Sequence, residues 1–352
     1  MTAAMTSIAV TGAESLTAVE APVPAPGPGQ ALVRVAYCGI CGSDVPRYFD
    51  GAVHAFPQVL GHEFSGAVAA TGPGCSTPVG TRVAVAPHIP CGRCGQCRDA
   101  NPTLCENHSF IGSRGPGAMA QYVLAPVENL VPAGVLSLRS AALVEPLTVA
   151  LHAVDQADAG SGMRAVVLGS GVIGLMTVLS LRDRGVDDDI TVVDINPWVL
   201  DVARTMGASR TINSAEQQDV AEALSGEPAP ELVIETAGAA ATIRQAPRLA
   251  AGRGRIVHVG KPTRPFEMDV DAFEQILRKE LTVRGSWLSY SSPFPGREWT
   301  DAVRVLANAP APPESIVTHE FGLDEAAAGF EVMRETGAER LKVMFRVFGE
   351  DV

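Results

Sequence analysis

A glycine-rich turn between an apolar run and a helix-like stretch constrains the fold of this chain most. Residues 165–185 read AVVLGSGVIGLMTVLSLRDRG, in which Gly169, Gly171 and Gly174 form the pattern G-x-G-x-x-G. The first glycine permits a tight turn, the second lets the backbone approach a pyrophosphate, and the third lets a helix pack closely on a strand. The segment therefore predicts a strand, a dinucleotide-binding turn and an amphipathic helix.

The residues around this turn indicate which dinucleotide would bind. Val172 and Ile173, between the last two glycines, are also expected to bind the cofactor, and the N-terminus of the helix would offer amide donors and the positive end of its dipole to phosphates. Glycines open many other strand–helix turns, but here TVVD at 191–194 ends a second strand, and Asp194 lies 20 residues beyond Gly174. An acidic side chain there accepts hydrogen bonds from the adenosine ribose and repels a 2′-phosphate, which favours NAD over NADP. Asp194 could also cap the helix that follows it.

Further apolar runs repeat the alternation of strand and helix. ELVIET at 231–236 and GRIVHVG at 254–260 read as strands with helical stretches between them, and LTVRGSW at 281–287 reads as a last strand. Such alternation is what a parallel, doubly wound α/β sheet requires. The remaining tail, through RLKVMFRVF at 340–348, is expected to return to a first domain, which makes that domain discontinuous.

Length, composition and charge exclude several classes of protein. A chain of 352 residues exceeds what one hydrophobic core usually serves, and 46% hydrophobic with 19% charged residues is an ordinary globular composition. The first ten residues do not read as a signal peptide, and the most apolar segment, 172–181, is too short to span a membrane. We therefore expect a cytoplasmic protein without a membrane partner. The net charge of −12 argues against a nucleic-acid partner.

Four of the seven cysteines are concentrated in CGRCGQCRDANPTLC at 91–105. Glycines and the Asn101–Pro102 pair allow the backbone to fold tightly, so that four sulfurs can converge. In a reducing compartment such a cluster favours tetrahedral zinc over disulfides, and four protein thiolates leave no open position for a substrate. We therefore expect a structural zinc; solvated thiols or a redox pair are the alternatives. The expected ligands are Cys91, Cys94, Cys97 and Cys105.

A second set of metal-binding residue types lies on either side of the four-cysteine segment. AYCGICGSD at 36–44, VLGHEF at 59–64 and LVEPLTVALHA at 143–153 contain cysteine, histidine and glutamate residues. Thiolate, imidazole and carboxylate are ordinary zinc ligands, and a mixed set with three firm ligands leaves a position for chemistry. Each residue alone is weak evidence, but their occurrence before a nucleotide motif favours catalytic zinc. The candidates are Cys41, His62, Glu63 and Glu145.

The order of these segments resembles the zinc-dependent medium-chain dehydrogenase/reductase family over essentially the whole chain. CGICGSD, GHE, the cysteine lobe, EP and the glycine motif occur in the order typical of that family. The resemblance implies an NAD-dependent enzyme with two zinc ions per chain, and a GroES-like, mostly-β catalytic domain joined to a Rossmann domain. The expected bounds are 1–150 for the catalytic domain with a structural-zinc lobe at 88–108, 151–286 for the Rossmann domain, and 287–352 for the return to the catalytic domain.

The resemblance also implies roles for individual residues. The ligand in the family is the second cysteine of the first motif, which assigns Cys41 and not Cys38, and Ser43 matches the hydroxyl that takes the substrate's proton. Glu63 and Glu145 can exchange between zinc and water during turnover. Asp44 could orient the histidine ligand or cap a turn.

Two features bear on the branch of the family and on the substrate. Glutamate in an EPL segment is typical of the polyol branch, whereas Pro46 stands where some relatives place a relay histidine. Residues 46–66, 110–122 and 276–299 are similar to an enzyme of that branch that acts on a phosphorylated hexitol, and a cyclitol or cyclitol phosphate is the second candidate.

The substrate contacts and the assembly are weaker expectations. Arg114 could hold a substrate phosphate or be a plain surface arginine. Trp287 could wall the substrate pocket or serve only in packing. The family resemblance implies a homodimer or homotetramer.

Overall fold

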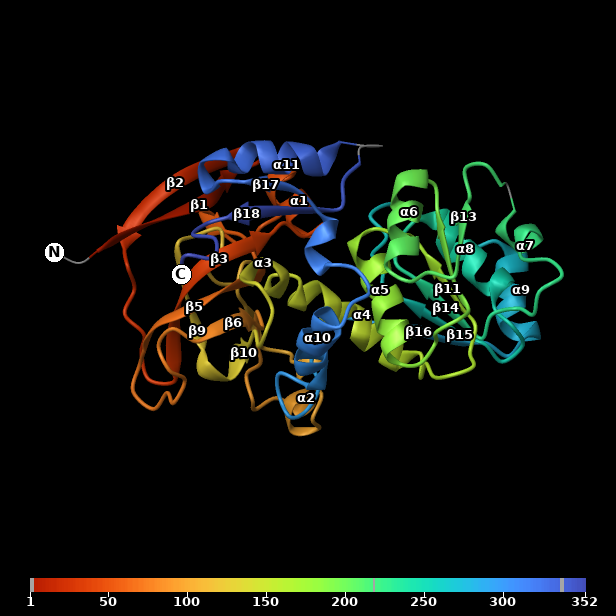
Figure 1. The fold of residues 1–352 in the computed structure, drawn as a ribbon, viewed down its shortest axis with the longest axis horizontal. Coiled ribbons are helices and arrows are strands. Elements are labelled where there is room, and N and C mark those ends of the chain that lie inside the picture. The colour runs from red at the N-terminus through yellow and green to blue at the C-terminus, as the bar shows by residue number, and fades with distance from the viewer. Residues whose placement is uncertain (1–2, 218, 336–338) are drawn as a thin grey trace. The chain divides into compact units, whose positions relative to one another are not determined.

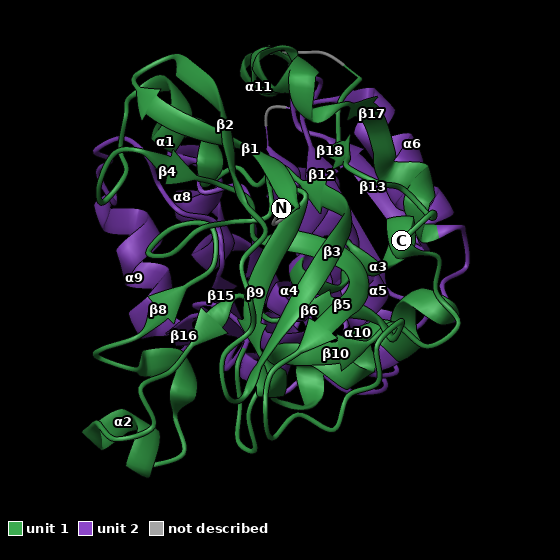
Figure 2. Ribbon diagram, turned by 90° about the vertical axis from the view of Figure 1, so that its left-hand side faces the viewer, with its two compact units in different colours: residues 1–145, 290–307, 313–352 green, residues 146–289, 308–312 purple. Residues whose placement is uncertain are grey.

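The computed structural model describes residues 3–217, 219–335 and 339–352, and they divide into two units (Figure 1). Unit 1 comprises Met1–Glu145, Tyr290–Ala307 and Pro313–Val352 (green in Figure 2), and unit 2 comprises Pro146–Ser289 and Asn308–Pro312 (purple). Unit 1 is thus built from segments far apart in the sequence. The domain bounds expected at 150 and 286 stay a prediction.

Unit 2 is a six-stranded parallel sheet with helices in its crossover connections. The strand order is β13-β12-β11-β14-β15-β16, so the chain runs outward in one direction from β11 and then restarts beside it at β14. The strands β11, β12 and β14 are almost wholly aliphatic because both faces of a parallel sheet are covered. This is the Rossmann order, which confirms the predicted doubly wound class. The strands are β11 Ala165–Leu168, β12 Ile190–Asp194, β13 Arg210–Asn213, β14 Leu232–Glu235, β15 Arg255–His258 and β16 Thr282–Gly285; the helices are α5 Val172–Asp183, α6 Pro197–Thr205, α7 Val220–Ala223, α8 Ala240–Leu249 and α9 Val270–Arg278.

Unit 1 is dominated by strands, as the sequence analysis predicted for the catalytic domain. Its seven-stranded sheet has the order β10-β6-β5-β3-β18-β17, with β9 also paired to β3, and smaller sheets join β2-β1-β4 and β7-β8. The strands are β1 Ala4–Gly12, β2 Ser15–Pro22, β3 Gln30–Gly39, β4 Gln58–Val59, β5 Glu63–Thr71, β6 Arg82–Val85, β7 His88–Ile89, β8 Ser109–Phe110, β9 Tyr122–Pro126, β10 Leu130–Pro132, β17 Val317–Phe321 and β18 Lys342–Arg346.

Short helices cover parts of unit 1. In Figure 1, α11 lies against β17 and β18, and the contacts of these elements agree. The helix α4 begins in unit 1 and continues into unit 2. The helices are α1 Asp44–Phe49, α2 Gly95–Arg98, α3 Leu138–Ala141, α4 Val144–Gln156, α10 Arg297–Ala307 and α11 Ala326–Arg334, with 3-10 turns at Pro102–Leu104, Val127–Asn129, Pro313–Ile316 and Leu323–Glu325.

The strand β18, late in the sequence, is part of the large sheet of unit 1. Its Met344 pairs with Gly39 of β3, antiparallel, and its other neighbour is the parallel strand β17. The core of unit 1 is formed by aliphatic and aromatic side chains of these strands, including Val33, Phe64 and Phe345. A strand from the end of the chain thus lies beside the central strand of the sheet.

A buried histidine holds the base of the cysteine lobe. His88 of β7 is fully buried, its Nε2 lies 2.8 Å from the Pro102 carbonyl oxygen, and its ring stacks on Tyr290 at 4.7 Å. The Tyr290 hydroxyl accepts a hydrogen bond from the His88 backbone N–H at 3.2 Å. Burial lowers the pKa of His88 from its ordinary value of 6.5 to about 4. The side chain is therefore neutral in the folded protein near neutral pH.

We expect His88 to make unit 1 sensitive to acid. The unfolded chain takes up a proton near pH 6.5 and the folded chain only near pH 4, so acidification in that window favours unfolding. The wild-type protein should lose about 1 to 2 kcal/mol of stability through this group between pH 7 and pH 5.

Denaturant unfolding at the two pH values tests this expectation. His88→Gln should be less stable at pH 7, but the difference from wild type should narrow at pH 5. The replacement His319→Gln, at a half-buried position on β17, is the matched control. An equal loss on acidification in wild type and His88→Gln would contradict the assignment.

Candidate functional site

Three side chains with metal-binding atoms converge in unit 1. One ligand atom from each of Cys41, His62 and Glu63 lies within 4.8 Å of the other two. The strands β3 and β5 are antiparallel and place Gly39 opposite Glu63, so the residues just after β3 and just before β5 lie at the same end of the sheet. The glutamate and the histidine are buried, and the cysteine is partly buried. The predicted candidates from two separate motifs are thus brought together.

Polar groups of the turn after β3 surround this cluster. Asp44 is fully buried; one of its oxygens accepts from the Cys41 backbone N–H at 3.2 Å and the other from Arg47 at 2.8 Å. The Asp44 carboxylate lies 3.6 Å from Nδ1 of His62, which is near but beyond hydrogen-bond range. Arg47 also donates to the Ser43 hydroxyl at 3.1 Å. Arg47 had no assigned role in the sequence analysis.

The fourth candidate, Glu145, is at the start of a helix. It is in the first turn of α4 and only 7% exposed. No oxygen of Glu145 joins the described atoms that lie within 4.8 Å of one another. Burial raises the pKa of Glu145 to about 8; the charge of His62 lowers it, and the charges of Glu63 and Cys41 raise it further. The carboxyl group is therefore electrostatically linked to the other three residues.

A buried lysine that the sequence analysis did not single out completes the charges at this place. Lys342 of β18 is 2% exposed, and its Nζ forms an ion pair with Glu63. The same Nζ donates to the Ile40 carbonyl oxygen at 2.9 Å. Burial by itself would lower the pKa of Lys342, but the charges of Glu63 and Cys41 raise it overall. The sequence did contain a feature that could have indicated Lys342: it is one of only three lysines among 27 basic residues.

The donor set fits zinc. Thiolate, imidazole and carboxylate are the ligand types that zinc takes in proteins. Burial raises the pKa of Cys41 to about 12 and that of Glu145 to about 8, and a divalent cation among these groups would favour their charged forms instead. Nδ1 of His62 is buried without a hydrogen-bond partner among the described residues. These groups are thus arranged as a cation would require.

The four cysteines of the lobe also converge. The Sγ atoms of Cys91, Cys94, Cys97 and Cys105 all lie within 4.8 Å of one another, and no disulfide joins these described residues. The Cys91 backbone N–H donates to Sγ of Cys105 at 3.2 Å, and the backbone N–H of Arg93 lowers the pKa of Cys91 to about 6. Amides directed at sulfur stabilise thiolates, and four thiolates suit a closed structural zinc site.

The glycine motif forms the turn between β11 and α5. Gly169 has φ +95°, a conformation that favours glycine, and a Cβ on Gly174 would lie 2.0 Å from the Gly169 carbonyl oxygen. A Cβ on Gly171, in contrast, would meet nothing within 4 Å, so the turn is open beside this residue. Gly171 caps α5, which begins at Val172 and continues with Ile173. Two glycines are required by packing, and the third leaves space beside a helix N-terminus.

Asp194 stands at the end of β12 beside the same turn. One of its oxygens accepts from the Ser170 backbone N–H at 2.7 Å and the other from the Asn196 backbone N–H at 2.9 Å. The side chain that caps α6 is Asn196, which accepts from the Trp198 backbone N–H, and not Asp194. Asp194 is therefore fixed next to the glycine turn, where a dinucleotide ribose would lie.

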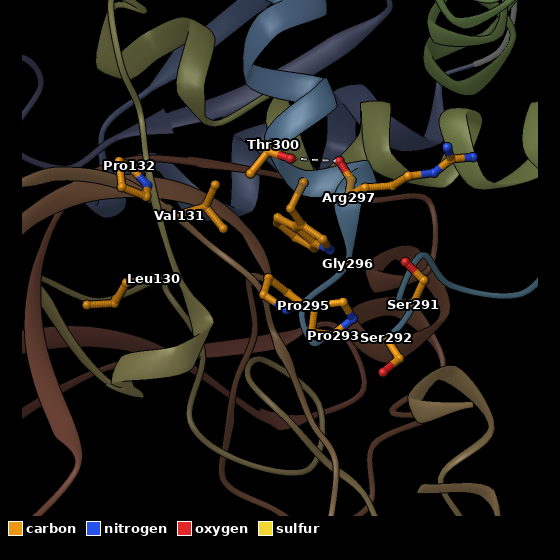
Figure 3. Close-up of a pocket in the computed structure, with 11 residues that line it drawn as sticks. Leu130, Val131, Pro132, Ser291, Ser292, Pro293, Pro295, Gly296, Arg297 and Thr300 are labelled. Atoms are coloured by element: carbon orange, nitrogen blue, oxygen red, sulfur yellow. Dashed lines mark hydrogen bonds between the residues drawn. The ribbon is translucent and has the colours of Figure 1, made fainter. Parts of the chain in front are cut away.

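The two weaker substrate candidates remain predictions. Arg114 is an exposed residue of unit 1, and Trp287, 60% exposed, belongs to unit 2. A groove of about 640 Å³ in unit 1 lies elsewhere, between β10 and the segment 291–300 (Figure 3). Figure 3 shows Leu130, Val131 and several prolines along this groove, and it contains neither the cysteines nor the histidine and glutamates described above.

None of the helices formed by residues 3–217, 219–335 and 339–352 has the length and apolar character that a membrane span needs.

Comparisons with known proteins place these sites in a family. Residues 27–135 match the alcohol dehydrogenase GroES-like domain, and residues 172–308 match the zinc-binding dehydrogenase model. The chain is 35% identical over 306 residues to galactitol 1-phosphate 5-dehydrogenase of Escherichia coli (strain K12), covering 85% of this chain and 87% of that protein. The crystal structure of galactitol-1-phosphate dehydrogenase from Escherichia coli has a TM-score of 0.91 at 31% identity, with 97% and 99% of the two chains covered.

Two other solved structures contain cofactors. An alcohol dehydrogenase from Escherichia coli CFT073 complexed with NADH is 28% identical, with a TM-score of 0.88 and coverage of 97% and 99%. A putative zinc-binding dehydrogenase from Sinorhizobium meliloti bound to NADP is 30% identical, with a TM-score of 0.88 and coverage of 98% and 99%. The predicted resemblance is confirmed: the chain belongs to the zinc-dependent medium-chain dehydrogenase/reductase family and is a zinc-dependent alcohol or polyol dehydrogenase.

Proposed function

We propose that the protein oxidises a secondary hydroxyl of a sugar-alcohol phosphate similar to galactitol 1-phosphate, with NAD as acceptor, and reduces the ketone in reverse. The observation that carries this proposal is the convergence of Cys41, His62 and Glu63 within 4.8 Å in a chain with 35% identity to a galactitol 1-phosphate 5-dehydrogenase. Cys41, His62 and Glu145 would hold the catalytic zinc, with Glu63 exchanging onto it, and the four lobe cysteines the structural one.

The side chains around the metal set would position the substrate and accept its proton. Bound zinc would favour ionisation of the substrate hydroxyl, and bound NAD would accept the hydride. Ser43 is exposed and its oxygen already accepts from Arg47, so its own proton is free to exchange with a substrate hydroxyl or with water. Arg47 also forms an ion pair with Asp44, whose carboxylate lies beside His62. These contacts support a proton path that starts at Ser43.

The end of β12 favours NAD. The Asp194 carboxylate is held by two backbone N–H groups beside the open side of Gly171. A negative charge at this place would accept from ribose hydroxyls and repel the 2′-phosphate of NADP. The residues that would bind the cofactor are Gly169, Gly171, Val172, Ile173, Gly174 and Asp194.

The alternative substrate is a cyclitol or cyclitol phosphate. Such a ring presents a vicinal secondary alcohol similar to that of a hexitol, and the same zinc and NAD sites would serve it. Arg114, which is exposed, would contact a phosphate in either case because guanidinium matches phosphate geometry.

Steady-state assays of NADH formation test the function. Galactitol 1-phosphate should be oxidised at least about 100-fold more efficiently than galactitol, since a charge-assisted contact to phosphate contributes roughly 3 kcal/mol. NAD should be preferred to NADP in the same assay, and Glu145→Ala should remove turnover and one of two zinc ions per chain.

The outcomes separate the parts of the proposal. Equal use of both polyols would leave the zinc and NAD assignments standing and favour the cyclitol, which is then assayed directly. Unchanged turnover in Glu145→Ala would show that the catalytic zinc site is wrong. The replacement Glu128→Ala, in a 3-10 turn of unit 1 away from the cluster, is the matched control.

We further propose that the protein is cytoplasmic and forms a homodimer, or a homotetramer built from two such dimers. A reducing compartment would keep the lobe thiols available for zinc. β16 is the last strand of its sheet in the described part of the chain, and each of its residues is exposed, so one row of its backbone groups has no neighbouring strand there. The adjacent helix α9 exposes Val270, Phe273 and Leu277. A second copy could pair its own β16 with this edge about a two-fold axis.

A charge at that edge tests the assembly. Val283→Lys would place a positive charge from each chain at the paired β16 edge, so the molar mass measured by light scattering should fall to that of one chain. Val135→Lys, at an exposed position of unit 1, should keep the wild-type mass. A wild-type protein of one chain at micromolar concentration would refute the proposal.

A further inference from the structure

The ion pair between Lys342 and Glu63 crosses an intervening strand of the sheet. Glu63 of β5 lies opposite Gly39 of β3, and Gly39 lies opposite Met344 of β18. Lys342 precedes Met344 by two residues, so its side chain shares the face on which Glu63 lies. Two strands separated by a third are about 9 to 10 Å apart, a distance that a lysine can span only if nothing stands between.

Gly39 leaves that path open. A Cβ at this position would lie 2.5 Å from Oε2 of Glu63 and 2.6 Å from Cε of Lys342. Its backbone does not adopt the left-handed conformation that would itself require glycine. The absent side chain therefore serves the contact between the ammonium and the carboxylate.

The ammonium joins the two segments that carry the candidate ligands. Its hydrogen bond to the Ile40 carbonyl oxygen fixes the residue directly before Cys41, and its ion pair fixes the residue directly after His62. Lys342 comes from the opposite end of the chain, 302 residues after Ile40.

The choice of lysine over arginine supports a specific role. Arginine supplies 24 of the 27 basic residues, yet the cation buried here is a lysine. An ammonium is compact and offers three donors as a point charge, whereas a guanidinium is a larger planar fork. Lys279 of unit 2 is a useful contrast, because its ammonium donates to the Pro247, Arg248 and Ala250 carbonyl oxygens.

We propose that Lys342 is a positioning residue that holds the Glu63 carboxylate away from the catalytic zinc, and so keeps a coordination position available to the substrate. This inference rests on the zinc site proposed above. Glu63 is close enough to Cys41 and His62 to be a ligand, and Lys342 competes with the metal for the same carboxylate. Without the ammonium, the buried carboxylate would turn to the metal as its remaining cation.

Replacement of Lys342 should therefore tighten zinc binding while slowing turnover. In Lys342→Met, the catalytic zinc should be lost about tenfold more slowly than from wild type during dialysis against dipicolinate. The value of kcat should fall about tenfold, with little change in KM. The cobalt-substituted variant should show a changed visible spectrum, because a carboxylate would replace an exchangeable ligand. A lysine with a merely structural role would give the opposite result, a faster loss of zinc.

Three further variants sharpen the test. Lys342→Met/Glu63→Gln removes both charges and should abolish the slow zinc loss. Lys279→Met is the matched control and should lower thermal stability without a change in zinc loss. If Lys342→Met does not fold, Gly39→Ala separates the pair with both charges present and should slow zinc loss in the same way.

The outcomes distinguish this inference from the proposed function. A wild-type protein that binds only one zinc per chain would refute the catalytic zinc site itself. A wild-type protein with two zinc ions, together with unchanged or faster zinc loss in Lys342→Met and Gly39→Ala, would refute the role of Lys342 alone.

Discussion

The burial of several ionisable side chains at one end of a β-sheet is the constraint on which unit 1 depends. Cys41, Glu63 and Asp44 lie near one another, and Glu145 is buried at the start of α4. Buried negative charges are costly unless cations or hydrogen-bond donors compensate them. Arg47 compensates Asp44, Lys342 compensates Glu63, and a divalent metal would compensate the thiolate and the remaining carboxylate. The fold thus supplies two of the three cations from its own chain.

The two units differ in how far their key contacts reach along the chain. The glycine turn, the cap of α5 and Asp194 lie within one strand–helix–strand segment, and the four lobe cysteines lie within fifteen residues. When all residues of a site lie in one short segment, their spacing in the sequence indicates the site directly. The class of unit 2 and the convergence of the lobe sulfurs could therefore be predicted without coordinates.

The metal set of unit 1 was predictable in composition but not in detail. Cys41 and His62 stand in short motifs, whereas the relation between Glu63 and Glu145 depends on how β5 and α4 meet. The structure brings Glu63 into the compact group and leaves the Glu145 oxygens outside it. The sequence shows the two carboxylates in different motifs and contains no spacing that ranks them as ligands, because their separation is set by tertiary packing.

Compensating charges are the hardest part of such a site to predict, for a physical reason. Metal ligands often stand in short motifs with a defined spacing in the sequence. A counter-ion can come from any part of the chain whose side chain reaches the site in the folded protein. Lys342 reaches it because β18 enters the sheet beside β3 and because Gly39 has no side chain. The counter-ion of the buried Glu63 carboxylate is thus set by the order of strands in the sheet, because Lys342 reaches it across Gly39. In a chain with so few lysines, a lysine within an apolar strand is the signal to follow, since burying its charge is favourable only beside an opposite one.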